Sequence, residues 1–186
     1  MMYISSQVTL SRYETYAIGR QGPEMTGIHV TSDKPLVVYS GNKKTSVQYG
    51  HNGGSLDHLI EQIPPVSTWG LKFILTPVPI RITGDEYKLL ASEDNTEITI
   101  RHGDTVLAHE IIATAGSYYM YHAAAGSVAT VVANKAILVV QFEQTLASGE
   151  SAGDPAMQII PPVYLFTPDY TFTTPQSGAL HICKSG

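Results

Sequence analysis

Apolar and polar residues alternate with a period of two along most of the chain, in short runs bounded by turn-forming residues. No apolar stripe with the 3.6-residue period of an amphipathic helix continues for more than about ten residues. The pattern therefore predicts an all-β, mostly antiparallel protein. The clearest predicted strands are Gly27–Thr31, Pro35–Tyr39, Lys72–Leu75, Tyr87–Ala91, Thr96–Ile100, Thr105–Ile111, Val128–Ala133, Ile137–Phe142 and Tyr170–Phe172.

Short polar breaks separate these runs at Asp33-Lys34, Glu93–Asn95, Gly103-Asp104 and Asn134-Lys135. Asp, Asn and Gly tolerate the left-handed backbone that tight hairpins require, so most neighbouring strands are expected to be antiparallel pairs. The acidic turn around Asp94 could also offer oxygen ligands to calcium. It lacks the spacing of an EF-hand loop, and a polar hairpin tip is the preferred interpretation.

Two segments of the chain resemble two others later in the sequence. Ile28–Tyr39 matches Ala129–Val140, and Asp57–Val66 matches Asp154–Val163, with a Pro-Pro pair in the same place. We therefore expect internal repeat copies at about 13–76 and 116–175, with an intervening β segment at about 85–111. Such units bury their faces against neighbours, which predicts repeated four-stranded units in a propeller-like or β-sandwich arrangement.

Residues 1–186 are thus interpreted as one partial domain, because the chain starts and stops partway through this alternation of strands. The first residues have neither a basic leader nor the apolar run of a secretory signal. This indicates either an intracellular protein or a fragment, and the incomplete repeat favours a fragment.

Composition narrows the classes of function further. The chain has 11 Lys and Arg against 16 Asp and Glu, a net charge of −5, without the basic patch of a nucleic-acid binder. No apolar run reaches the length of about 18 residues needed to span a membrane. The single cysteine, Cys183, rules out an intramolecular disulfide framework and a thiolate metal cluster.

The strongest candidate for catalysis or metal binding is the local cluster of Asp57, His58 and Glu61. A helical turn there would place both carboxylates on one side, as a metal-assisted or carboxylate-based hydrolase would need. The repeat argues against this role, because Pro155 and Gln158 replace His58 and Glu61 in the second copy. A turn residue that accepts hydrogen bonds from its own backbone explains Asp57 better, and we predict no catalytic residue, cofactor or metal.

Tyrosine is abundant, with 11 residues against 4 Phe and 1 Trp, and it supplies large contact area with a polar tip. Sheet packing accounts for most of these tyrosines. The long glycine-rich loop from Val47 to Ser55 is different, because it resembles an exposed loop tip and carries Tyr49 and His51. These two residues are the predicted binding residues.

Longer blocks of the sequence resemble the N-terminal domain of the IgG Fc-binding protein family. The most specific block is Asp57–Gly70, and the likeness covers most of the chain, from about Tyr13 to Pro175. It is also carried by Ser32–Asn42, Ala91–Thr96, Ala133–Phe142 and Gly153–Met157.

The resemblance implies a secreted, non-enzymatic recognition module, joined in relatives to mucin-like or von Willebrand-type domains in mucus and extracellular matrix. The implied partner is a protein or glycoprotein with an immunoglobulin-like surface, with roles in innate immunity or adhesion. Many relatives carry two cysteines where this sequence has Lys44 and Leu56, which is consistent with a deleted disulfide. A hydrolase and a structural, self-assembling matrix unit are the alternative functions.

Overall fold

The computed structural model describes residues 6–19, 22, 24–50, 55–79, 81–147, 149–150 and 153–173. The regular elements of this part of the chain are strands and two short 3₁₀ turns, which confirms the all-β, mostly antiparallel prediction. In chain order they are β1 (Val38–Thr45), β2 (Asp57–Ile63), η1 (Val66–Thr68), β3 (Gly70–Leu75), β4 (Asp85–Ala91), β5 (Thr96–His102), β6 (Thr105–Ile112), β7 (Tyr118–Ala123), β8 (Ala129–Glu143), β9 (Ala156–Ile160) and η2 (Val163–Leu165).

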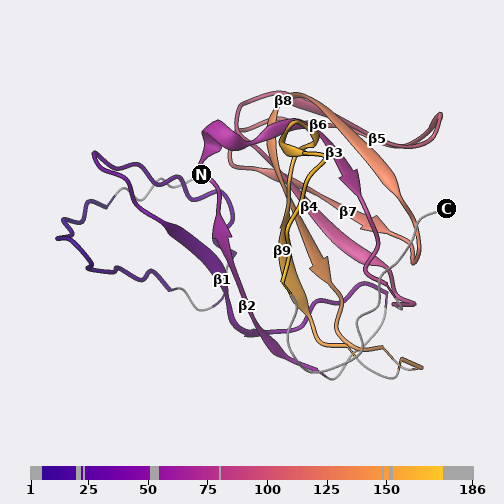
Figure 1. Cartoon of the computed structure of the whole chain (residues 1–186), viewed down its shortest axis with the longest axis horizontal. Coiled ribbons are helices and arrows are strands. Elements are labelled where there is room, and N and C mark those ends of the chain that lie inside the picture. Colours follow the sequence, from indigo (N-terminus) through magenta and orange to yellow (C-terminus); the bar gives the residue numbers. More distant parts are fainter. Residues whose placement is uncertain are drawn as a thin grey trace.

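The long strand β8 organises a seven-stranded antiparallel sheet. Its first part pairs with β5 on one side and β3 on the other, and its second part pairs with β4 and β9. β6 extends the sheet beyond β5, and β7 extends it beyond β4. The sheet curls around its core, and β1 and β2 form a separate antiparallel ribbon beside it (Figure 1). The described residues thus show one curled sheet and a ribbon, and neither the propeller-like nor the sandwich arrangement is confirmed.

The predicted hairpin turn at Asn134-Lys135 is wrong, because β8 continues through it. The side chain of Asn134 accepts a hydrogen bond from the Glu97 N–H at 2.9 Å, and Lys135 Nζ donates to the Asp94 carbonyl at 2.6 Å. The Ser92 N–H donates to the Ala136 carbonyl at 3.2 Å. These bonds hold the chain against the turn between β4 and β5, so the polar pair marks the middle of a strand.

The hydrophobic core lies inside the curl of the sheet and follows the period of two. Alternate residues of β3, β4, β5 and both parts of β8 form the core cluster, among them Phe73, Tyr87, Leu89, Ile98, Ile100, Val131 and Val139. Tyr87 keeps its polar end satisfied, because its hydroxyl donates to the Thr76 carbonyl at 2.8 Å. Burying one large apolar side chain stabilises the folded state by about 1.5 to 3 kcal/mol, so this cluster is the main source of stability.

Strands β3, β4, β5 and β6 confirm the predictions for those segments, and the turns at Asn95 and Gly103 have the expected positive φ of 53° and 55°. Gly27–Thr31 and Tyr170–Phe172 belong to no strand, and β1 begins at Val38 rather than at Pro35. The alternating pattern at these segments is real, but a strand forms only beside a partner strand, which the described residues do not supply there.

No helix among the described residues is long and apolar enough to cross a membrane.

Candidate functional site

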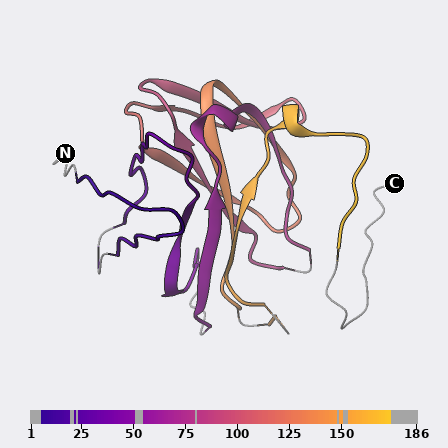
Figure 2. The ribbon, with the colours of Figure 1, turned by 60° about the vertical axis from the view of Figure 1, so that its left-hand side comes forward.

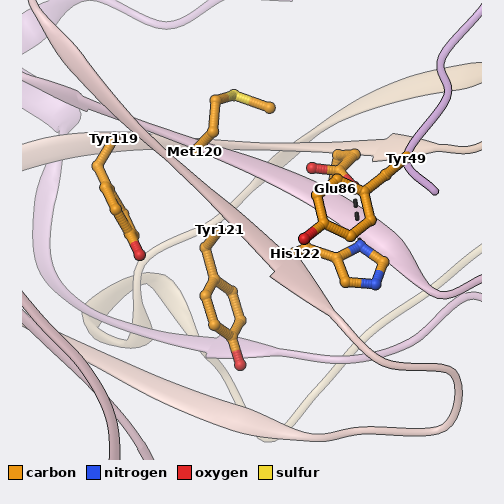
Figure 3. A pocket seen from close by; sticks show the side chains of 6 residues that line it. All are labelled: Tyr49, Glu86, Tyr119, Met120, Tyr121 and His122. Carbon is orange, nitrogen blue, oxygen red and sulfur yellow. Dashed lines mark hydrogen bonds and ion pairs between the residues drawn. The ribbon is translucent and has the colours of Figure 1, made fainter.

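A surface pocket of about 510 Å³ lies where β7, β4 and the loop after β1 meet. Its lining combines aromatic and titratable side chains from segments far apart in the sequence (Figure 3). The lining residues are Tyr49, Glu86, Tyr119, Met120, Tyr121 and His122.

β7 supplies four of these residues in succession, and its alternation divides them between two faces. Tyr119 and Tyr121 point to one side of the strand in Figure 3, and both pack against the hydrophobic core. Met120 and His122 occupy the other face, as period two requires. Among the described strands β7 pairs only with β4, so its second edge is open beside the pocket.

His122 lies directly opposite Glu86 in the β4–β7 pairing. Its Nδ1 is 2.8 Å from the Glu86 Oε1, and the Glu86 side chain is almost fully buried. Burial raises the pKa of Glu86 above its usual value, while the hydrogen bond from His122 acts in the opposite direction. The pair therefore holds a buried carboxylate next to an imidazole that remains partly accessible.

Tyr49 covers this imidazole from the predicted loop. The two rings stack with 3.9 Å between centroids and an interplanar angle of 18°. The loop is attached to the chain just after β8, since the Tyr49 N–H donates to the Gln144 Oε1 at 2.9 Å and the Val47 N–H donates to the Thr145 Oγ1 at 2.9 Å. The structure thus brings Tyr49 to the pocket, whereas His51 lies outside the described residues.

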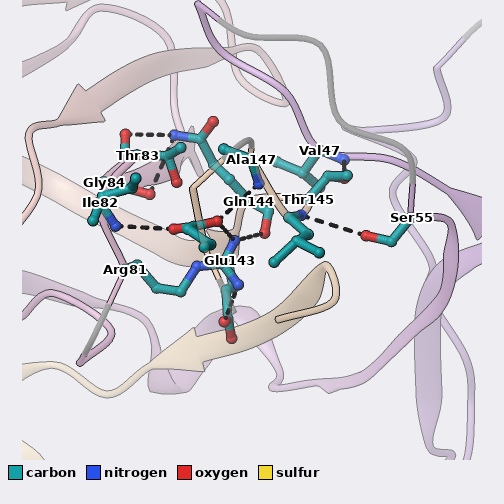
Figure 4. A network of polar contacts seen from close by, with 12 residues as sticks. Val47, Ser55, Arg81, Ile82, Thr83, Gly84, Glu143, Gln144, Thr145 and Ala147 are labelled. Carbon is teal, nitrogen blue, oxygen red and sulfur yellow. Dashed lines mark hydrogen bonds and ion pairs between the residues drawn. The ribbon is translucent and has the colours of Figure 1, made fainter. Parts of the chain in front are cut away.

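A buried polar network around Arg81 lies next to Gln144 and Thr145, the residues that hold the Tyr49 loop (Figure 4). Arg81 contacts Glu143 at 2.8 Å and Glu150 at 3.1 Å, and its Nη2 donates to the Gln144 carbonyl at 2.5 Å. The Gln144 amide also donates to the carbonyl of Thr83 at 3.0 Å. Gln144 therefore connects the Arg81 network to the backbone of Tyr49.

Glu150 is held as a charged partner of Arg81. Burial alone would raise its pKa, but backbone N–H donors from Ala147 and Ile82, together with Arg81, lower the pKa of Glu150 below its usual value. The network consequently stabilises the ionised form of a carboxylate whose side chain is 2% exposed. Such a network has a structural use, because it fixes the segment that carries the loop.

Asp57, His58 and Glu61 all lie on β2, so the helical turn that would gather them is absent. Along a strand, Asp57 and Glu61 are about 13 Å apart and His58 faces the opposite side. The Asp57 Oδ1 accepts a hydrogen bond from the His58 N–H at 2.7 Å, as expected for a carboxylate that caps its own backbone. In the described ranges no group of three His, Cys, Asp or Glu side chains is placed to hold a metal ion.

Sequence reasoning missed Glu86, Met120 and His122 as members of the site. The available signal is the dense group of tyrosines around Tyr121, but packing of the sheet already accounts for Tyr119 and Tyr121, which contact the core. The partnership of Glu86 with His122 depends on the register of β4 against β7, which no local pattern encodes.

Comparison with known proteins places the chain in a family. The family model described as IgGFc binding protein matches residues 4–185. The human IgGFc-binding protein is 26% identical over 166 residues, which are 88% of this chain and 3% of the human protein. The chain therefore spans a small fraction of the length of that relative, and no solved structure matches it. Since the family match runs through all the strands described above, including both sides of the Tyr49–His122 pocket, the chain belongs to the IgGFc binding protein family.

Proposed function

We propose that this chain is a non-enzymatic, extracellular protein-binding module whose partner, a protein or glycoprotein, contacts the surface formed by Tyr49, Met120 and His122. The name of the human relative specifies binding to IgG Fc, so Fc is the first partner to test. The observation that carries the proposal is the stacking of Tyr49 on His122, which holds an exposed aromatic ring in place beside an open strand edge.

The chemistry of this surface is that of a recognition site. Tyrosine and methionine are enriched in the buried centres of protein interfaces, where rigid aromatic rings give contact area at low entropic cost. The open edge of β7 adds unpaired backbone N–H and C=O groups that an extended partner segment can use. A partner that covers the pocket would also reduce the solvation of the Glu86–His122 pair.

The proposal extends to the setting of the chain. The human relative is much longer than the stretch matched here, and we propose that this module acts beside further domains of a secreted protein. Sequencing the transcript on both sides of the present ends tests this part. A secretory signal and further extracellular domains are expected, and stop codons close to both ends would contradict it.

Binding of the purified chain to immobilised IgG Fc, measured by biolayer interferometry, tests the partner and the surface together. We expect Tyr49→Ala to weaken binding at least about tenfold, or about 1.4 kcal/mol. Tyr16→Ala is the matched control, because Tyr16 and Tyr49 are both 55% exposed and Tyr16 lies outside the pocket. Absence of Fc binding by the folded chain would overturn Fc as the partner, and equal binding by Tyr49→Ala and the unaltered chain would overturn the surface.

A further inference from the structure

Two parts of the structure repeat the same strand pairing, residue for residue. In the β1–β2 ribbon, Val38 faces Ile63 and Asn42 faces Leu59. In the curled sheet, the matching residues of β8 and β9 face each other in the same register, from Val139 opposite Ile160 to Glu143 opposite Ala156.

The same local structure follows both pairings. A Pro-Pro pair leads into a 3₁₀ turn, closed by a hydrogen bond of 2.9 Å from the Thr68 N–H to the Pro65 carbonyl after β2. After β9 the corresponding bond runs from the Leu165 N–H to the Pro162 carbonyl, also at 2.9 Å. The ribbon is therefore built like the β8–β9 edge of the sheet.

β3 pairs with the first part of β8, next to the β8–β9 pairing. In the part of the chain that the structure describes, no strand pairs in this way with the residues that lead into β1. β3 follows η1 directly and pairs with the first part of β8, so that Phe73 faces Val131 and Leu75 faces Ala129. Both Phe73 and Val131 are buried. By the sequence match of Ile28–Tyr39 with Ala129–Val140, the counterparts of Ala129 and Val131 are Ile28 and Val30.

Ile28 and Val30 lie in a described segment that belongs to no strand, and they are 54% and 48% exposed. They alternate with His29 and Thr31, which is the pattern of a strand with one apolar face. The segment is thus an acceptor edge, and no strand among the described residues occupies on it the place that β3 occupies on β8.

A donor for this edge follows η2, in the place that β3 occupies after η1. In the segment Thr167–Phe172, Tyr170 stands where β3 has Phe73 and Phe172 stands where β3 has Leu75. Tyr170 is 65% exposed and Phe172 is 73% exposed, and neither belongs to a strand. This donor segment lies on the opposite side of the curled sheet from the acceptor edge (Figure 2), so pairing within one chain would require one of them to cross the molecule.

We propose that the chain associates head to tail, with the donor segment of one copy added as an antiparallel strand to the acceptor edge of a second copy. The register is that of β3 on β8, which places Tyr170 opposite Val30 and Phe172 opposite Ile28. The contact is heterologous, so each copy keeps one free donor and one free acceptor and the association is open-ended. It buries four exposed apolar side chains and gives backbone partners to two unpaired segments. The proposal goes beyond partner binding at the Tyr49 pocket, which lies elsewhere.

Sedimentation velocity over a concentration series up to about 1 mM, the range that detects weak association, tests the proposal. The unaltered chain is expected to form larger species as its concentration rises. Val30→Asp disrupts the acceptor edge and Phe172→Asp disrupts the donor segment, so each variant alone is expected to stay monomeric. An equimolar mixture of the two variants is expected to form dimers and nothing larger, because one intact donor meets one intact acceptor. The double variant, mixed with either single variant, is expected to leave both proteins monomeric, because no intact donor then meets an intact acceptor.

Val106→Asp is the control, since Val106 is 47% exposed and lies on β6, and it should associate like the unaltered chain. Circular dichroism of each variant checks that it is folded. A chain that stays monomeric throughout the series would overturn the proposal. So would association that Val30→Asp and Phe172→Asp leave unchanged, or a mixture that stays monomeric while the unaltered chain associates.

Discussion

The imidazole of His122 lies between two partners, because its ring stacks on Tyr49 at 3.9 Å and its Nδ1 meets the buried Glu86 at 2.8 Å. The loop that carries Tyr49 and the edge strand that carries His122 are thereby joined through one side chain. A change at His122 therefore acts on the exposed surface and on a buried charge at the same time.

His122→Ala is expected to lower the free energy of unfolding by about 1 to 3 kcal/mol, because it leaves the buried Glu86 side chain without its hydrogen-bond partner. Adding Glu86→Gln in the same chain should restore part of this loss, since the buried group is then neutral. Urea unfolding followed by tyrosine fluorescence measures both variants.

His109→Ala is the control for this pair of variants. His109 also contacts a carboxylate, Glu97, at 3.4 Å, but both side chains are about half exposed. Its removal should change the free energy of unfolding by less than about 1 kcal/mol. A loss at His122 no larger than that at His109 would show that the Glu86–His122 pair contributes little.

Arg81→Met tests the buried network that anchors the loop. The change removes the cation that contacts Glu143 and Glu150 and that also donates to the Gln144 carbonyl. A loss of about 3 to 5 kcal/mol in the free energy of unfolding is expected, because two carboxylates lose their compensating charge. Arg101→Ala is the comparison, since its side chain makes one exposed hydrogen bond at 3.3 Å, and it should stay within about 0.5 kcal/mol of the unaltered chain.

The sequence was sufficient to predict the strands whose alternation and partners are both local. β5 and β6 are joined by the Gly103 turn and pair with each other, so pattern and turn chemistry agree there. The pattern was misleading at Asn134, where a turn-type side chain serves a neighbouring backbone instead. It also predicted strands at Gly27–Thr31 and Tyr170–Phe172, for which the described residues hold no partner.

The site was predictable only at Tyr49. A glycine-rich loop with a tyrosine at its tip suggested a contact residue, and the structure places Tyr49 in the pocket, although its binding role stays a prediction. The other members are set by long-range register, since Glu86 meets His122 across two strands and Gln144 reaches Tyr49 from the end of β8. Such pairings depend on the whole sheet, which local alternation does not specify.

Asp85→Asn tests a buried carboxylate that the Arg81 network does not neutralise directly. Asp85 is 1% exposed, and its Oδ2 accepts a hydrogen bond from the Val78 N–H at 2.9 Å. Burial raises its pKa above the usual 3.8, against the opposing effect of the Val78 hydrogen bond. Because the pKa is raised in the folded state, the ionised form of Asp85 lowers the stability of the fold at neutral pH. Protonation removes this destabilisation as the pH falls through the raised pKa toward 3.8.

The unaltered chain should therefore gain stability relative to Asp85→Asn as the pH falls from 7 to about 4. Denaturant unfolding of both proteins at several pH values measures the difference. Glu86 and Glu143 contribute to it in the same direction, because the charge of Asp85 also raises the pKa of each. A difference that is constant with pH would show that Asp85 has an ordinary pKa in the folded protein, and a change in the opposite direction would show that its pKa is lowered.

Glu24 ties the segment before β1 to the edge of the curled sheet. Its carboxylate contacts Lys88 on β4 and accepts a hydrogen bond from the Tyr118 hydroxyl on β7. Burial opposes ionisation, but the hydrogen bond from Lys88, with those from Thr26 and Tyr118, lowers the pKa of Glu24 to about 2. The segment also comes close to the turn that precedes β7, since a Cβ on Gly27 would lie 2.1 Å from the Gly116 carbonyl oxygen.

A lowered pKa gives a contribution that is complete above the usual value of 4.5 and is lost as the pH falls through about 2. Glu24→Gln should release the segment at every pH, whereas the unaltered chain should release it only under strong acid. Hydrogen exchange of the amides of residues 24–28, compared at pH 6 and pH 3, measures this, because an ionised Glu24 still holds the segment at pH 3. Glu14→Gln changes an exposed carboxylate that accepts a hydrogen bond from the nearby Ser11 N–H, so it should leave this exchange unaltered. Equal protection in Glu24→Gln and the unaltered chain at pH 6 would show that the close approach of Gly27 to Gly116 holds the segment without the ion pair.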